Sequence, residues 1–221
     1  MVGIHDCTYR VSWKYPINFL VVIFKPAGLF QLLQTDMSCL RNNLHNLRSL
    51  GLKESEWICE NLRKLPEHRD KIIFIERWLE RKLAQTPPAA GITGELAQVI
   101  VKRKGSVQIN DLSTEFGVNK KYLERHFFLE LGSGPKEFAG LVRFNYLNML
   151  MLQQAVSWQE LIYLGNFHDQ SHLIKHFHRI TGLTPGKFKQ TADRRPEAKF
   201  VTKHNVYELI LANAAIPGAM A

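Results

Sequence analysis

Two stretches of the chain, "DLSTEFGVNKKYLERHFFLELGSGPKEF" (Asp111–Phe138) and "ELIYLGNFHDQSHLIKHFHRITGLTPGKF" (Glu160–Phe188), share one pattern. They align at an offset of 49 positions before a turn and of 50 positions after it. The matched pairs are Leu112/Leu161, Leu123/Leu173, Phe127/Phe177, Gly132/Gly182, Pro135/Pro185 and Phe138/Phe188. One shift inside an otherwise constant match indicates a duplicated supersecondary unit, and we call the two stretches the first copy and the second copy.

Each copy predicts a helix-turn-helix. A short helix leads to a turn at Gly117 or Asn166, the residue types that best tolerate the positive φ of a tight turn. The second helix should end, and a new helix begin, within Gly132–Pro135 and Gly182–Pro185. A helical solenoid is the alternative, but it needs three or more repeats, and the sequence has two.

A long helix is predicted between the copies, from Pro135 to about Gln153. At 1.5 Å per residue it would span roughly 27 Å. Its apolar side would consist of Phe138, Leu141, Val142, Leu147 and Leu150.

The segment before the two copies has a different character. The run "INFLVVIF" (Ile17–Phe24) predicts a strand and "KPAG" (Lys25–Gly28) a turn, whereas Asp70–Leu83 has the periodicity of an amphipathic helix. Pro87 and Pro88 should end that helix. We therefore expect a mainly α fold with two helix-turn-helix subdomains joined by a long helix and preceded by a small α+β region. The expected domains are 1–88, 89–195 and a C-terminal tail, 196–221.

Composition limits the classes of partner and compartment. The formal net charge of +9 favours a polyanion such as nucleic acid. Cys7, Cys39 and Cys59 form no CxxC motif, which argues against a disulfide framework or a structural zinc site and for a reducing cytosol. The longest apolar run is too short to span a bilayer, and the first residues have no export-signal pattern, so we expect no membrane association.

The two copies resemble the paired helix-turn-helix DNA-binding domain of the AraC/XylS transcription regulators. The residues that carry the resemblance are Glu160-Leu161, the D-Q-S-H-L run from Asp169, the G-L-T-P run from Gly182, and Y-L-x-R-x-F from Tyr122. The family usually has glycine where this chain has Asn166. The resemblance implies a bacterial, cytoplasmic protein that binds double-stranded DNA and has no cofactor.

Upstream, Phe19–Leu33 and Arg69–Leu83 resemble the end of a cupin-like sensor domain in one AraC-like subgroup. Residues 1–35 are too few to form a barrel of about eight strands, so a reduced or truncated sensor is expected. The resemblance leaves RNA polymerase, a small-molecule effector and a second copy of the chain as candidate partners.

Four histidines lie at positions 168, 172, 176 and 178. The first three are spaced at i, i+4 and i+8 and would share one face of a helix, which raises the alternative of a metal site. In the first copy the residues aligned with His172, His176 and His178 are Tyr122, His126 and Phe128. A packing or backbone-contact role explains Tyr, Phe and His together, so we predict no metal site. Nor does any nucleophile or orienting acid stand at a catalytic spacing.

Helix geometry selects the residues expected to bind DNA. If Leu123 and Phe127 face the core, the opposite face of the second helix in the first copy is exposed. In helix-turn-helix proteins the N-terminal half of this second helix enters the major groove. The predicted DNA-binding residues are Lys120, Lys121, Glu124 and Arg125 in the first copy and Gln170, Ser171, Ile174 and Lys175 in the second. Basic side chains and Gln suit purine edges, Glu suits cytosine N4, and Ile suits the thymine methyl group.

The predicted function is a sequence-specific transcription regulator that reads two successive major grooves and has no catalytic activity. The alternative is a sequence-tolerant architectural DNA-binding protein. An enzymatic alternative, a DNA-repair methyltransferase fused to this type of domain, would need a metal-held reactive cysteine set that the three cysteines do not form.

Overall fold

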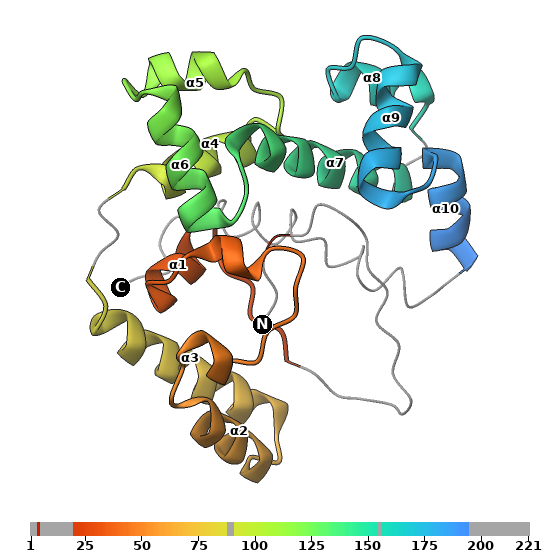
Figure 1. The fold of residues 1–221 in the computed structure, drawn as a ribbon. Coiled ribbons are helices and arrows are strands. Elements are labelled where there is room, and N and C mark those ends of the chain that lie inside the picture. The colour runs from red at the N-terminus through yellow and green to blue at the C-terminus, as the bar shows by residue number, and fades with distance from the viewer. Residues whose placement is uncertain (1–3, 5–19, 88–90, 154–155, 195–221) are drawn as a thin grey trace. The chain divides into compact units, whose positions relative to one another are not determined.

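The computed structural model describes residues 4, 20–87, 91–153 and 156–194, which are mainly helical (Figure 1). This confirms the mainly α fold class. The described residues form two compact units. The first unit contains residues 4, 20–87, 91–94 and 125–133, and the second contains 95–124, 134–153 and 156–194.

The upstream part of the first unit consists of short helices followed by a helical pair. In chain order these are α1 (Gly28–Leu33), the 3₁₀ helices η1 (Met37–Leu40) and η2 (Arg48–Leu50), α2 (Ser55–Lys64) and α3 (His68–Ala84). Helix α3 confirms the helix predicted over Asp70–Leu83, and it ends before Pro87 as expected.

The strand predicted over Ile17–Phe24 is not confirmed. Part of that segment lies outside the described residues, and the described part, Leu20–Phe24, has no regular secondary structure. Four consecutive apolar side chains there, Leu20 to Ile23, are exposed. A strand forms only where a neighbouring strand supplies hydrogen-bond partners, so a β-branched run alone does not ensure one.

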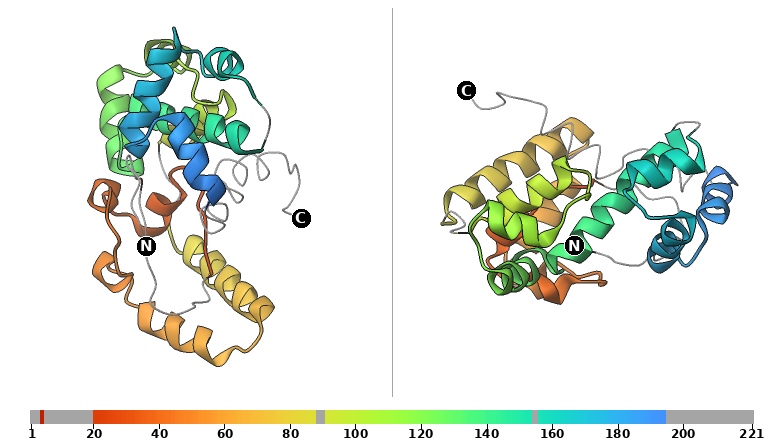
Figure 2. Two further views of the ribbon diagram at one scale, coloured as in Figure 1. Left: turned by 90° about the vertical axis from the view of Figure 1, so that its right-hand side faces the viewer. Right: turned by 90° about the horizontal axis from the view of Figure 1, so that it is seen from above.

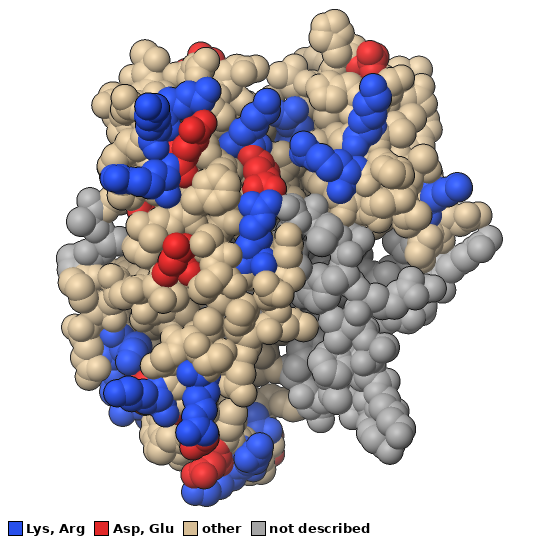
Figure 3. Space-filling view, in the orientation of Figure 1, with Lys and Arg blue, Asp and Glu red and all other residues tan. Residues whose placement is uncertain are grey.

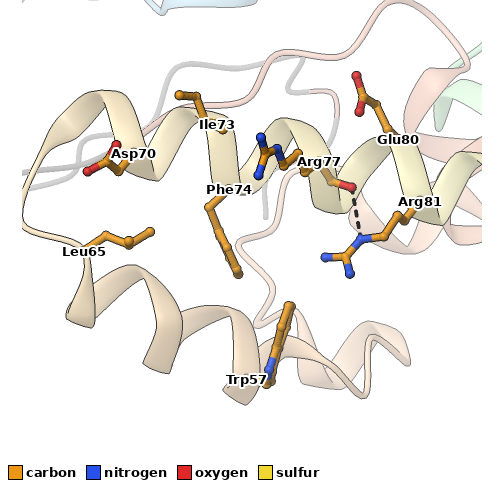
Figure 4. Close-up of a pocket in the computed structure, with 8 residues that line it drawn as sticks. All are labelled: Trp57, Leu65, Asp70, Ile73, Phe74, Arg77, Glu80 and Arg81. Carbon is orange, nitrogen blue, oxygen red and sulfur yellow. Dashed lines mark hydrogen bonds between the residues drawn. The ribbon is translucent and has the colours of Figure 1, made fainter.

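Helices α2 and α3 pack through aromatic residues and leave an open groove between them (Figure 4). The rings of Trp57 and Phe74 are 5.2 Å apart between centroids, and Lys82 forms an ion pair with Glu54 at 3.2 Å. Within the part of the chain that the structure describes, no α3 side chain is fully buried, so the amphipathic helix predicted from sequence leaves part of its apolar stripe exposed.

The end of helix α6 (Lys120–Leu131) belongs to the first unit. Gly132, which follows it, has a φ of +78°, and a Cβ added there would lie 2.6 Å from the carbonyl oxygen of Met37. The chain therefore requires glycine at this position both for its backbone conformation and for the close approach of a neighbouring backbone.

The remaining helices follow the duplicated pattern. They are α4 (Thr93–Lys102), α5 (Ile109–Glu115), α7 (Pro135–Gln153), α8 (Trp158–Leu164), α9 (Gln170–Thr181) and α10 (Pro185–Arg194). The bounds of α8 are those of α5 shifted by 49 positions, and the bounds of α9 are those of α6 shifted by 50. The structure therefore repeats the helices with the same one-residue insertion that the sequence shows.

Helix α7 forms as predicted (Figures 1 and 2). Its buried side chains provide much of the second unit's core. It contacts α8 and α9, and α9 in turn contacts α10. Phe144 of α7 packs edge-on against Phe177 of α9 at 4.9 Å and against Phe188 of α10 at 6.2 Å. These ring contacts join α7 to two helices of the second copy, α9 and α10.

Candidate nucleic-acid interface

Helix α6 presents the first set of predicted DNA-binding residues. The side-chain oxygen of Asn119 accepts a hydrogen bond from the backbone N–H of Lys121 at 2.7 Å, which caps the start of the helix. Leu123 and Phe127 are completely buried, as predicted. The four predicted residues, Lys120, Lys121, Glu124 and Arg125, are all exposed on the first turns of this helix.

Helix α9 presents the second set in the same way. Asp169 caps it by accepting a hydrogen bond from the His172 N–H at 2.8 Å, and Leu173 and Phe177 are buried. Gln170, Ser171 and Lys175 are exposed, whereas Ile174 is half-buried. Each set of four therefore lies on one capped helix, and Ile174 is the least accessible of the eight residues.

Both turns adopt the conformation that the sequence predicts. Gly117 has a φ of +61° and Asn166 a φ of +51°, so asparagine adopts the left-handed conformation that glycine supplies in the first copy. The second helix of each copy ends at a glycine of positive φ, Gly132 or Gly182, and α7 and α10 begin at Pro135 and Pro185. These local predictions are confirmed.

The opposite side of α6 carries a buried polar cluster that the sequence analysis missed. Glu130, which is 4% exposed, accepts a hydrogen bond from the Thr93 hydroxyl at 2.9 Å. The same oxygen of Glu130 lies 3.1 Å from His126 Nδ1. The available signal was a glutamate within an otherwise apolar stretch of helix. Such a glutamate is expected to be buried, and a buried carboxylate needs a hydrogen-bond or charge partner.

His176 of α9 has a different set of contacts. Its Nε2 lies 3.1 Å from the carbonyl oxygen of Gly140 in α7, so the neutral ring donates a hydrogen bond to that carbonyl. Burial, together with the nearby positive charges of Arg179 and Arg143, lowers the pKa of His176 to about 4. The ring is therefore neutral near pH 7, and it holds α9 against α7.

Arg143 and Gly105 form a second connection to α7 that the sequence analysis missed. The Arg143 guanidinium donates to the Gly105 carbonyl from Nη2 at 3.0 Å and from Nε at 3.3 Å, and burial lowers the pKa of Arg143. Gly105 has a φ of +72°, and a Cβ there would lie 2.2 Å from the Ala139 carbonyl oxygen. A lone glycine in a basic loop gave no sequence signal of this approach.

The four histidines of the second copy do not converge. His168, His172 and His178 are exposed, whereas His176 is buried against α7. His172 stacks edge-on against Phe167 at 5.0 Å. The predicted packing or backbone-contact role is confirmed for His176. In residues 4, 20–87, 91–153 and 156–194, no three His, Cys, Asp or Glu side chains gather in a way that could hold a metal ion.

Basic side chains are spread over the face of the molecule in Figure 3, and acidic side chains lie among them. This distribution agrees with a net charge of +9 that no single segment accounts for. Charge alone therefore does not locate a DNA-binding surface, and the capped helices α6 and α9 remain the better guide. None of the helices in the described part of the chain is both long and apolar enough to cross a lipid bilayer.

Comparison with known proteins identifies the region around these two helices. The model of a helix-turn-helix domain family matches residues 112–191, which include α6, α7, α8 and α9 in full. No curated protein and no solved structure gives a significant match. The matched family is regulatory rather than enzymatic. Residues 112–191 are therefore similar to helix-turn-helix domains of AraC type, which are DNA-binding domains of transcription regulators.

Proposed function

We propose that this protein is a sequence-specific transcription regulator that reads two successive major grooves of DNA, one with α6 and one with α9. The residues proposed to contact the DNA are Lys120, Lys121, Glu124, Arg125, Gln170, Ser171, Ile174 and Lys175. The reading helices differ in sequence, so a single chain should recognise an asymmetric site. We propose no catalytic activity for it.

The observation that carries this proposal is the repeated geometry of the two reading helices. Each is capped by a short polar side chain, each buries a Leu and a Phe four residues apart, and each exposes nearly all of the predicted residues in its first turns. In helix-turn-helix proteins the N-terminal residues of the second helix contact base edges. The same arrangement occurring twice in one chain supports two reading elements.

The length of α7 supports successive grooves. Its 19 residues are those predicted from the sequence. At 1.5 Å per residue such a helix spans roughly 27 Å, against about 34 Å for one turn of B-DNA. A modest bend in the DNA would make up the difference, at a cost of about a few kcal/mol that additional contacts can repay.

The proposed domain limits are 1–88 for a reduced sensor or association region, 89–195 for the DNA-binding domain and 196–221 for a tail. RNA polymerase, a small-molecule effector and a second copy of the chain are the proposed partners of such a regulator. A bacterial regulator of this kind would act in the cytoplasm, where the chromosome lies.

The test is selection of bound sequences from random DNA at a fixed salt concentration. The proposal predicts an asymmetric consensus with two clusters of preferred bases about one helical turn apart, bound roughly 10³-fold or more tightly than random DNA. A sequence-tolerant architectural protein would instead give no consensus and nearly equal affinity for all sequences, and this result would overturn the proposal.

A further inference from the structure

A chain of polar contacts runs from the interior of the first unit to the reading face of α6. The Thr93 hydroxyl donates to Glu130 Oε1 at 2.9 Å, and the same oxygen lies 3.1 Å from His126 Nδ1. The other ring nitrogen, His126 Nε2, lies 3.2 Å from Nη2 of Arg125. All four residues belong to the first unit.

The chemistry of these groups determines the direction of the hydrogen bonds. An arginine side chain has only donors, so Nε2 of His126 must accept from Arg125. A neutral imidazole that accepts at Nε2 carries its proton on Nδ1, and this N–H then donates to the Glu130 carboxylate. The contacts with Glu130 and Arg125 therefore select the same tautomer of His126.

Burial fixes the Glu130 end of this series of contacts, whereas the Arg125 end is accessible. The side chains of Glu130 and His126 are 4% and 21% exposed, whereas Arg125 is exposed. Space around Glu130 is limited, because a Cβ added to Gly91 would lie 3.1 Å from its Oε1. Oε2 of Glu130 is buried without a hydrogen-bond partner, so the carboxylate depends on Thr93 and His126. The carboxylate is thus held in place and can orient the imidazole.

We propose that Glu130 and His126 are positioning residues, which hold the guanidinium of Arg125 in the orientation that reads a base edge. This inference rests on the proposed function, because it assigns Arg125 to base contact. Ordering the guanidinium before binding removes part of the entropy cost of forming a bidentate contact with a guanine. The base position read by Arg125 should consequently be among the most stringent in the site.

The second copy provides an internal comparison for this role. Ile180 occupies the position that Glu130 has in the first copy, and His176, aligned with His126, donates to the Gly140 carbonyl. The positioning device therefore exists in the first copy and has no counterpart in the residues of the second that align with it.

The experiment is a double-mutant cycle on the selected DNA site. His126→Phe keeps a ring but removes both hydrogen-bonding nitrogens, whereas His126→Gln retains one acceptor and one donor. Each is combined with native Arg125 and with Arg125→Ala.

Affinity is measured for the selected site, for the three base changes at the position that Arg125 reads, and for random DNA. His178→Phe, the same change at an exposed histidine of α9, is the control, and thermal melts check folding.

We expect His126→Phe to reduce discrimination at that one base position by about fivefold, the size of one lost hydrogen bond, and to leave affinity for random DNA unchanged. His126→Gln should restore part of the discrimination. In the Arg125→Ala background His126→Phe should have almost no further effect on specificity.

Two results would overturn the positioning role while leaving the proposed function intact. One is selective loss with Arg125→Ala but no change with His126→Phe. The other is a loss of DNA affinity with His126→Phe that is equally large with native Arg125 and with Arg125→Ala, or equally large on all DNA sequences. Either form of that loss would assign His126 to stability alone. If Arg125→Ala itself alters no base position, then the role of Arg125 in the proposed function and the positioning role both fail.

Discussion

The two copies place a histidine at the same point of α6 and α9 but use it differently. His126 of α6 lies between an exposed arginine and a buried carboxylate, whereas His176 of α9 is buried and donates to the backbone of α7. The residue four positions further along also differs, since it is Glu130 in the first copy and Ile180 in the second. Duplication has thus preserved the helices while the contacts that hold them have diverged.

The largest effect should come from the core that both copies share. Phe127→Ala and Phe177→Ala each remove a fully buried ring, and each should lower the free energy of unfolding by about 3 to 5 kcal/mol. Phe177→Ala also removes the edge-on contact of this ring with Phe144. Urea unfolding measures both. If either variant were as stable as the native protein, the two phenylalanines would not have equivalent roles in the cores of the two copies.

The glycines that end α6 and α9 should differ in their tolerance of a side chain. Gly132→Ala and Gly182→Ala both place a Cβ in the left-handed region, which costs about 1 to 2 kcal/mol. Only at Gly132 would the Cβ also approach a backbone carbonyl, at 2.6 Å, whereas at Gly182 nothing lies within 4 Å. The Gly132 variant should therefore be the less stable in thermal unfolding. If the Gly182 variant were the less stable, the close approach of the Met37 carbonyl oxygen to Gly132 would be contradicted.

The buried His176 of the second copy predicts that stability depends on pH. Because the pKa of His176 is lowered to about 4, the folded state disfavours the protonated ring. As pH falls from about 6.5 to about 4, protonation of the unfolded chain should reduce the free energy of unfolding by roughly 2 to 3 kcal/mol. Above that window the contribution is constant.

His176→Gln removes the titration and retains a donor for the Gly140 carbonyl. Its unfolding free energy, compared with its own value at pH 7.5, should fall less steeply with acidification than that of the native protein. Parallel curves for the two proteins would show that His176 does not titrate with the lowered pKa.

The smallest effect should come from the turns. Asn166→Gly relieves the left-handed strain of asparagine but increases the entropy of the unfolded chain, so its net effect on stability should stay within about 0.5 kcal/mol. Gly117→Asn is the matched exchange in the first copy and should cost less than about 1 kcal/mol. A loss of several kcal/mol in either variant would show that one turn needs a specific residue.

The sequence predicted the elements that depend on local chemistry. The limits of α7, the positive φ of Gly117 and Asn166, and the burial of Leu123 and Leu173 each follow from turn residues, helix signals or apolar spacing. The aligned copies were especially informative, because any signal in one copy could be checked against the other.

The features that the sequence did not reveal depend on contacts between distant positions. The Thr93 hydroxyl reaches Glu130 across 37 positions, and Arg143 reaches the Gly105 carbonyl across 38. The periodicity of residues within one helix predicts which side of the helix is buried, but it does not identify a hydrogen-bond partner so far away in the sequence. The strand expected over Ile17–Phe24 illustrates the converse limit, because strand propensity without a pairing partner does not make a strand.

The claim that α6 and α9 read different parts of one DNA site is tested most directly by comparing base preferences of Arg125→Ala and Lys175→Ala, which alter aligned positions of the two copies. The control is Lys102→Ala, an exposed lysine at the end of α4. Each reading-helix variant should lose about 1 to 3 kcal/mol of discrimination at its own base position, and the two positions should lie about 10 base pairs apart. Loss at the same position, or equal loss on specific and random DNA in both variants, would contradict two separate reading helices.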